Sequence, residues 1–246
     1  MKKIISLLFI LNISVSAAQT PSGEWILERI DENWVSGNKI YVTNMVIHGR
    51  RGADRTIQSK SWIQGSEKSF TEYLSPAREK GTKMLKLEDQ LWTYTPSTDR
   101  TIQISGHMLR QSVMGSDLSY EDMMEDTELK ELYDAEVTGE DTVISRPCWV
   151  VELTAKTSDV AYYSRKMWVD KERFVVLRAY LYAKSGKLLK TTEIKNVIRV
   201  QGRWVPNVIV FKDALKEGEG TEFIIESVEF DVDIPDYIFT KAALRR

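Results

Sequence analysis

Apolar and polar residues alternate along most of this chain, which is the pattern of a β-strand with one buried face. The alternation is clearest from Val175 to Ala183, where every second residue is apolar. We predict strands where this pattern, or a run of β-branched and aromatic residues, lies between turn residues. These segments are residues 39–50, 55–64, 68–74, 80–87, 90–95, 100–104, 148–154, 162–169, 174–183, 187–200, 203–212 and 221–232.

Tight turns join many of these segments. Ser185-Gly186 and Gln201-Gly202 each lie between two predicted strands, at the short spacing typical of a hairpin. Successive hairpins favour one large antiparallel sheet over alternating βαβ units. A sheet of this length must curl or close. We therefore expect a mainly β fold with some α (α+β), in one domain that spans residues 19–246.

One predicted hairpin, formed by residues 80–87 and 90–95, allows a register to be assigned. If Glu88-Asp89 is a two-residue turn, Leu85 lies opposite Trp92. Glu-Asp is not a favoured sequence for such a turn, so the register depends on that loop length. The alternation then places four apolar side chains on one face of the hairpin, namely Leu85, Leu87, Trp92 and Tyr94.

A helix is expected before the first strand. Ile26, Ile30 and Trp34 recur at four-residue spacing and form one apolar stripe. Thr20 or Ser22 is placed to cap the start of this helix. The pattern is typical of a helix that packs on a sheet.

The middle of the chain also has helical spacing, in residues 108–114 and 119–124. Ser119 and Asp122 resemble a capping box, in which each residue accepts a hydrogen bond from the backbone of the other. These two segments contain half of the chain's eight methionines: Met108, Met114, Met123 and Met124. We expect two short helical segments here.

The first eighteen residues have the organisation of a secretory signal peptide. Lys2 and Lys3 precede an apolar stretch, residues 4–15, and Ser16-Ala17-Ala18 supplies small residues for cleavage. The apolar stretch is shorter than the roughly 20 residues of a membrane-spanning helix. We expect cleavage after Ala18, export to the periplasm and a mature net charge of −4 after loss of the two lysines from a total of −2.

Composition excludes several functional classes. The balanced charge lacks the basic excess of a nucleic-acid-binding surface. One cysteine, Cys148, and two histidines, His48 and His107, exclude an internal disulfide and a zinc site built mainly from these residue types. We expect no metal site and no cofactor, and a buried, unreactive thiol at Cys148.

The sequence carries no recognisable catalytic set. Nucleophile-elbow, phosphate-loop and dinucleotide motifs are absent from it. Ser116 of the Gly115-Ser116-Asp117 segment invites comparison with a nucleophile, but no histidine lies near it in the sequence. A turn followed by a helix start explains the segment better, since Gly115 permits unusual dihedral angles and Asp117 or Ser119 can accept from free N–H groups. We expect no enzymatic activity.

An ordered series of short motifs resembles the outer-membrane lipoprotein-sorting protein family, the relatives of the periplasmic carrier LolA. The most specific is Met-Gly-Ser-Asp-Leu-Ser-Tyr-Glu-Asp at residues 114–122. The resemblance extends over nearly the whole mature chain. The other motifs are residues 76–81, 84–87, 91–96 with Arg100, 166–170, 186–190, 202–206 and 234–240.

The resemblance implies an incomplete antiparallel β-barrel whose concave apolar face is covered by short helices. The implied ligand is an acyl chain of a lipoprotein or a similar lipid, carried by a monomer. Partners would be an inner-membrane transporter and an outer-membrane acceptor. The expected cavity residues are Leu85, Leu87, Trp92, Tyr94, Met108, Leu109, Val113, Met114, Met123 and Met124. Gly115, Ser116, Asp117 and Tyr120 would form the turn of the cover.

Two other functional classes stay open at this point. A sensor or regulator of the RseB type, or an accessory protein of an envelope transporter, would bind the same ligands. Such a sensor would normally need an additional partner-binding domain, and no composition shift marks one. A lipid-modifying enzyme would need chemistry that the sequence lacks. Periodicity alone favours an ordinary closed core over a cavity, because apolar faces usually form core.

Overall fold

The computed structural model describes residues 20–34, 37–49, 53–124 and 128–246. The predicted signal peptide and its cleavage site lie outside these residues. Within them, one antiparallel sheet has the strand order β6-β5-β4-β3-β2-β1-β13-β12-β11-β10-β9-β8-β7. The strands are β1 (Asn38–Ile47), β2 (Arg55–Gln64), β3 (Lys68–Ser75), β4 (Lys83–Leu87), β5 (Gln90–Thr95), β6 (Arg100–Ile104), β7 (Tyr133–Val143), β8 (Arg146–Ala155), β9 (Ser164–Asp170), β10 (Val176–Tyr182), β11 (Leu188–Val200), β12 (Arg203–Asp213) and β13 (Thr221–Phe230).

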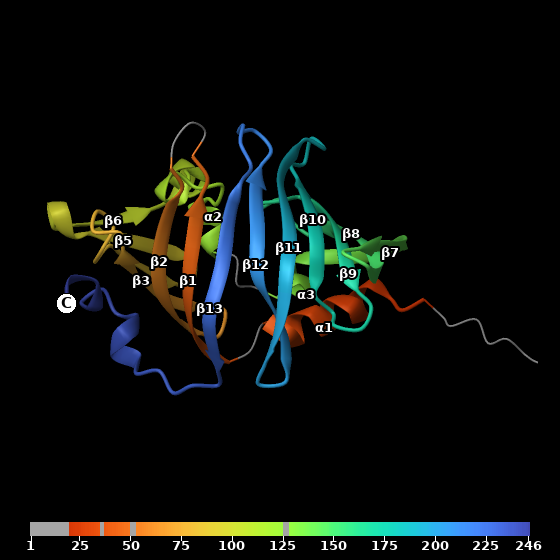
Figure 1. Cartoon of the computed structure of the whole chain (residues 1–246), viewed down its shortest axis with the longest axis horizontal. Coiled ribbons are helices and arrows are strands. Elements are labelled where there is room, and N and C mark those ends of the chain that lie inside the picture. The colour runs from red at the N-terminus through yellow and green to blue at the C-terminus, as the bar shows by residue number, and fades with distance from the viewer. Residues whose placement is uncertain (1–19, 35–36, 50–52, 125–127) are drawn as a thin grey trace, which may run out of the picture.

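The sheet is curved, and its helices lie on the concave side. In Figure 1 the central strands β1, β13, β12 and β11 face the viewer, while the short helices α2 (Tyr120–Met124) and α3 (Leu129–Leu132) lie behind them. Every neighbouring pair of strands is antiparallel, and neighbours in the sheet follow one another in sequence except where β1 meets β13. The expected mainly β fold, with a curved open sheet and short covering helices, is confirmed.

Helix α1 (Gly23–Trp34) covers the half of the concave face that β7 to β10 form. Ser22 caps it, because its Oγ accepts a hydrogen bond from the Trp25 amide at 3.2 Å. Ile26 and Leu27 are completely buried against strand residues that include Val151 and Leu153. Ile30 packs on the same cluster, so this part of the predicted apolar stripe faces the sheet, while the side chain of Trp34 lies outside the described part of the structure.

The β4–β5 hairpin has the expected register. Leu85 pairs with Trp92 across the two strands, and Leu87 pairs with Gln90. Glu88 adopts a φ of 54°, which a two-residue turn of this kind requires even though Glu-Asp is uncommon there. Tertiary packing of the hairpin on both faces outweighs the unfavourable turn sequence.

Two elements between α2 and β8, namely α3 and β7, were not expected from the sequence. Strand β7 is an edge strand whose residues are mostly exposed, and it is rich in acidic residues such as Asp134, Glu136 and Glu140. Such an edge lacks the apolar alternation by which the other strands are recognised. Helix α3 has only four residues, too few to show helical periodicity.

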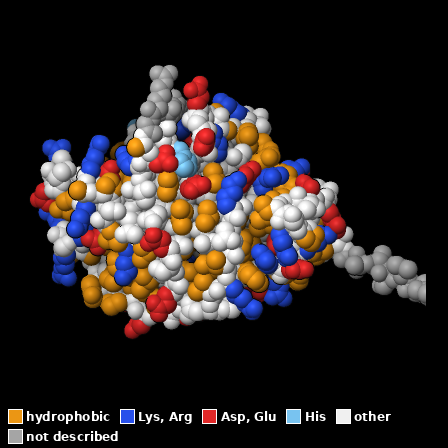
Figure 2. Space-filling view, viewed as in Figure 1, with side chains coloured by type: hydrophobic (Ala, Val, Ile, Leu, Met, Phe, Trp, Pro, Cys, Tyr) orange, Lys and Arg blue, Asp and Glu red, His pale blue; other side chains and the backbone are white. Residues whose placement is uncertain are grey.

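The other face of the sheet, called the outer face here, is partly covered by the C-terminal segment, defined as residues 234–246. This segment contains two short 3-10 helices, η4 (Asp236–Phe239) and η5 (Ala243–Arg245), which lie against β3, β4 and β5. It passes in front of the strands at the left of Figure 1. Elsewhere on the outer face, Figure 2 shows hydrophobic side chains in small patches among charged ones.

Candidate functional site

A cavity of about 380 Å³ lies between the concave face and the elements that cover it. Its size falls within the roughly 300 to 1,000 Å³ of typical ligand pockets. Its wall is mainly apolar and comes from strands on both halves of the sheet, for example Met84 and Leu91 on one half and Met167, Leu181 and Ile209 toward the other. Such a wall suits an apolar ligand, because burying each CH₂ group contributes about 0.8 kcal/mol.

The cover, defined as residues 106–124, closes one side of this cavity. It consists of η2 (Gly106–Arg110), η3 (Val113–Gly115) and α2. Ser119 and Asp122 form the expected reciprocal capping box, with the Ser119 amide donating to Asp122 at 2.6 Å and the Asp122 amide donating to Ser119 at 3.2 Å. The expected helices are present, but those before Ser116 are short 3-10 turns rather than α-helix.

The six apolar cover residues named from the sequence as cavity residues meet in one cluster on the concave face, but Met123 alone among them lines this cavity, and Met124 lines a second one described below. The cluster is centred on buried residues that include Val113 of the cover and Met84 and Leu91 of the sheet. Its partly buried members from the cover are Met108, Leu109, Met114, Tyr120, Met123 and Met124.

The four hairpin residues expected in the cavity lie elsewhere, which corrects their predicted position. Leu85, Leu87, Trp92 and Tyr94 share one face, as expected, but it is the outer face. There they pack under the C-terminal segment, with Leu85 completely buried and Trp92 6% exposed. Period-two alternation shows which residues share a face but does not show which face is concave. The intervening residues Met84 and Leu91 line the cavity instead.

The turn at Gly115-Ser116 has a structural role. Gly115 has a φ of 78°, a conformation that favours glycine. Ser116 is completely buried, and its hydroxyl donates to the Val113 carbonyl at 2.7 Å and accepts from the Leu118 amide at 3.2 Å. The hydroxyl is therefore committed to the turn and has no activating base among these contacts.

Asp117 fastens the turn to the sheet. Its carboxylate accepts a hydrogen bond from the Thr221 hydroxyl at 2.8 Å and one from the Asp213 amide at 3.0 Å. Lys216 also donates to the Ser116 carbonyl at 2.6 Å. The expected helix-start role belongs to Ser119, which accepts from the Asp122 amide, whereas Asp117 accepts from the Asp213 amide at the end of β12.

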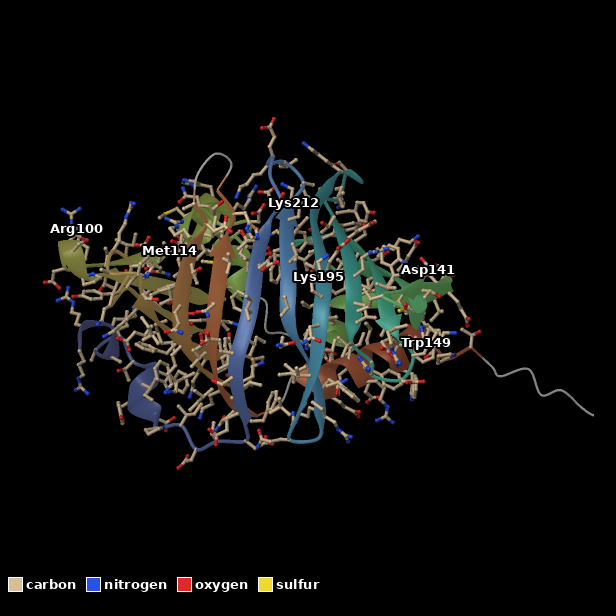
Figure 3. All side chains as sticks on the ribbon, viewed as in Figure 1. Arg100, Met114, Asp141, Trp149, Lys195 and Lys212 are labelled. Atoms are coloured by element: carbon tan, nitrogen blue, oxygen red, sulfur yellow. The ribbon has the colours of Figure 1, made fainter. Side chains whose placement is uncertain are left out.

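Two further basic residues hold the cover through its backbone. Arg55 of β2 donates to the carbonyl of Met114, which Figure 3 labels on the β1–β2 side of the sheet. Lys86 of β4 donates to the carbonyl of Met124 at 2.8 Å. The cover is thus attached both by these polar contacts and by the apolar cluster that its side chains form with the concave wall.

A buried polar cluster stands at one end of the cavity. Asp122 of α2 forms an ion pair with Lys190 of β11 and accepts a hydrogen bond from the Tyr162 hydroxyl at 2.6 Å. The two charged side chains are only 9% and 6% exposed. Beyond this cluster lies a second, more polar cavity of about 760 Å³, and Lys190 lines both cavities. The cluster therefore separates an apolar chamber from a half-polar one.

Other polar side chains that line the cavity are engaged in contacts between neighbouring structural elements. Asp31 of α1 accepts hydrogen bonds from the Leu129 and Lys130 amides at the start of α3, and burial raises the pKa of its carboxyl despite those bonds. The Arg165 guanidinium lies 4.6 Å from the centre of the Tyr133 ring and donates to its hydroxyl. Sequence reasoning missed these residues, because they lie far apart in the chain and only the folded sheet brings them together.

The described residues contain no group of three or more His, Cys, Asp or Glu side chains placed to hold a metal ion. Cys148 is completely buried, and burial raises the pKa of its thiol. A search of those same residues for a helix long and apolar enough to span a membrane finds none.

Comparison with known proteins agrees with this architecture. A family model described as an uncharacterized protein matches residues 65–246. A DUF1329 family protein from Desulfovibrio piger is 27% identical, with a TM-score of 0.81 over 90% of this chain and 97% of that one. A LolA superfamily protein from Nitrosomonas europaea is 26% identical, with a TM-score of 0.76 over 91% of this chain and all (100%) of that one. The chain is LolA-like in fold and sequence.

A third structure shares the fold of this LolA-like protein. It is an outer membrane lipoprotein-sorting protein domain from Vibrio parahaemolyticus, 23% identical, with a TM-score of 0.79 over 91% of this chain and 98% of that one. No curated protein sequence matches the chain. The three structures align with nearly their full length, so the curved sheet and its cover together correspond to the whole of each relative.

Proposed function

We propose that this LolA-like protein is a periplasmic carrier that binds acyl chains of lipoproteins or similar lipids and releases them unchanged. The observation that carries the proposal is the apolar cavity of about 380 Å³ beneath a methionine-bearing cover. Methionine side chains are unbranched and adapt to ligands of different shape. The cover competes with the ligand for the same apolar wall, so the affinity stays limited and release remains possible.

Transfer toward the outer membrane requires partners. An inner-membrane transporter would load the carrier and an outer-membrane acceptor would unload it. The carrier itself needs no catalytic group for this role, because the acyl chain moves between sites without a covalent change. A monomer suffices, since one chain supplies the sheet, the cover and the cavity.

A carrier of this kind must first be exported. We infer that residues 1–18 direct secretion and are removed, which leaves a chain that begins at Gln19. Intact-mass measurement of the protein from the periplasm should give the mass of residues 19–246. A full-length, membrane-bound product would contradict this part of the proposal.

The binding role is tested with a fluorescent acyl probe and a variant that fills the cavity. Ala179 is 5% exposed and lines the cavity from β10, so Ala179→Phe should abolish most probe binding. Ala214→Phe, in the exposed turn after β12, is the matched control and should bind like wild type. Thermal unfolding of both variants separates lost binding from lost folding, since overpacking costs about 1 to 3 kcal/mol.

The same assay tests for turnover. The probe recovered from the wild type and from Ser116→Ala should be chemically intact by mass spectrometry. Hydrolysed probe, with hydrolysis lost in Ser116→Ala, would favour a lipid-modifying enzyme instead. Native mass spectrometry of the protein purified from its periplasm would identify the ligand carried there.

A further inference from the structure

The polar cluster between the two cavities contains an ion pair that joins a covering element to the sheet. Asp122 belongs to α2, a helix of five residues, whereas Lys190 belongs to the long strand β11. Tyr162 holds the second carboxylate oxygen of Asp122 at 2.6 Å. The Lys190 ammonium also lies 5.8 Å from the centre of the Tyr162 ring. A cation and a hydroxyl thus converge on one carboxylate at the edge of the apolar cavity.

Displacement of the cover would separate this pair. Asp122 would leave with α2, while Lys190 would stay in place because its strand lies within the sheet between β10 and β12. A buried charge that loses its partner is strongly unfavourable. A ligand that brings its own negative charge to Lys190 removes that cost, whereas a neutral ligand does not.

We propose that the carrier selects acyl ligands with an anionic headgroup, whose oxygens replace Asp122 on Lys190 and on the Tyr162 hydroxyl. This inference rests on the proposed acyl-binding function and names the chemical class of the ligand. The tail occupies the apolar cavity, and the anion lies at the boundary where Lys190 faces both chambers. Both a carboxylate and a phosphate carry negative oxygens that can accept hydrogen bonds from Lys190 and the Tyr162 hydroxyl.

The second cavity can hold the part of a larger headgroup that extends beyond Lys190. Its volume is about 760 Å³, and its charged lining is mixed, with the basic residues Arg110, Lys184 and Lys190 and the acidic residues Glu121, Asp159 and Asp213. It also has apolar walls, such as Leu132 and Leu189. A fatty acid would end at Lys190, whereas a phospholipid would place its phosphate at Lys190 and extend the rest of its headgroup into this space.

Ligands of equal chain length test the proposal on the wild-type protein. Dodecanoate, dodecyl phosphate and dodecan-1-ol are compared by displacement of a neutral acyl probe at pH 8, below their micelle concentrations. Both anions should bind at least about tenfold more tightly than the alcohol, the effect of one hydrogen bond to a charged group. The tighter of the two anions distinguishes a carboxylate ligand from a phosphate ligand. Equal affinity for all three would overturn the proposal, whereas failure of all three to bind would overturn the carrier function itself.

A substitution identifies the residue responsible. In Lys190→Gln the preference for the anions should fall to less than about twofold, while the alcohol should bind at least as well as before. Lys195→Gln is the matched control, because Lys195 projects from the outer face of the same strand and pairs with Glu193 at 2.8 Å. Unchanged anion preference in Lys190→Gln would contradict the role of Lys190. If this variant does not fold, Tyr162→Phe should reduce the preference in the same direction.

Discussion

Strands β3, β4 and β5 carry two apolar faces, and each face has its own covering segment. On the outer face the C-terminal segment buries Leu85 and Leu244 completely, and Phe239 is 5% exposed. On the concave face the cover leaves a cavity of about 380 Å³ beside Met84 and Leu91. The same short strands therefore support a closed core on one side and an open chamber on the other.

The two covering segments are attached in different ways. The C-terminal segment is held mainly by aliphatic and aromatic contacts, with the Lys241 ammonium 4.0 Å from the centre of the Trp92 ring, and Lys83 donates to the carbonyl of Arg246. The cover combines an apolar cluster around its buried Val113 with polar contacts from Arg55, Lys86 and its own Asp117. Complete apolar packing on the outer face favours a permanent seal, whereas the cavity beneath the cover leaves fewer apolar contacts to break on opening.

The largest expected effect is on the outer face. Leu85→Ala should lower the free energy of unfolding by about 2 to 5 kcal/mol, because it leaves a cavity in a completely packed core. The folded fraction should bind an acyl probe with wild-type affinity. Chemical denaturation and probe titration measure the two quantities.

Met84→Ala, one residue away on the same strand, should have the opposite combination of effects. It should change the probe affinity, and it should lower the free energy of unfolding less than Leu85→Ala does. If Leu85→Ala weakened binding more than Met84→Ala, the assignment of the two faces would be wrong.

This pair of residues also shows how far the sequence determined the site. The alternation in residues 80–95 predicts correctly that Leu85 faces Trp92, because pairing and side-chain period are local properties. The direction in which a sheet curves depends on all of its strands and on what covers each face. The prediction that Leu85 and Trp92 line the cavity is therefore wrong, because these residues lie on the opposite face of the hairpin.

The cover was easier to predict than the wall. Its capping box and its methionines are short-range features, and both are present as expected. The ion pair between Asp122 and Lys190 joins residues far apart in the chain, so no local pattern indicates it. Strand β7 was not predicted because an exposed, acidic edge strand lacks the alternation of apolar and polar residues.

A smaller effect is expected for the methionine side chains of the cover. Met123→Ala should lower the free energy of unfolding by less than about 2 kcal/mol, because Met123 is only partly buried. Its main result should be faster amide hydrogen exchange in residues 119–124, with unchanged exchange in the C-terminal segment. Equal acceleration in both segments would mean that the two coverings behave alike.

The smallest effect should come from the carboxyl of Asp31 on the concave side. Burial raises its pKa above the ordinary value of 3.8, so the folded state binds this proton more tightly than the unfolded state does. The wild type should therefore lose stability relative to Asp31→Asn as the pH rises from below 3.8 through the folded pKa. Denaturation of both proteins across that range measures the difference. If the difference in unfolding free energy between the two proteins did not change with pH, the Asp31 carboxyl would not have a raised pKa in the folded state.

The central claim is that the cover opens to admit ligand, and a reversible cross-link tests it most directly. In a Cys148→Ala background, cysteines at positions 122 and 190 are joined through a short bis-thiosulfonate linker that reduction removes. A neutral acyl probe is used, and each single-cysteine variant treated with the linker is the control. The linked protein should fail to take up the probe and should recover on reduction. Equal probe binding by the linked and reduced forms would contradict the account, because the cover would then be fixed core.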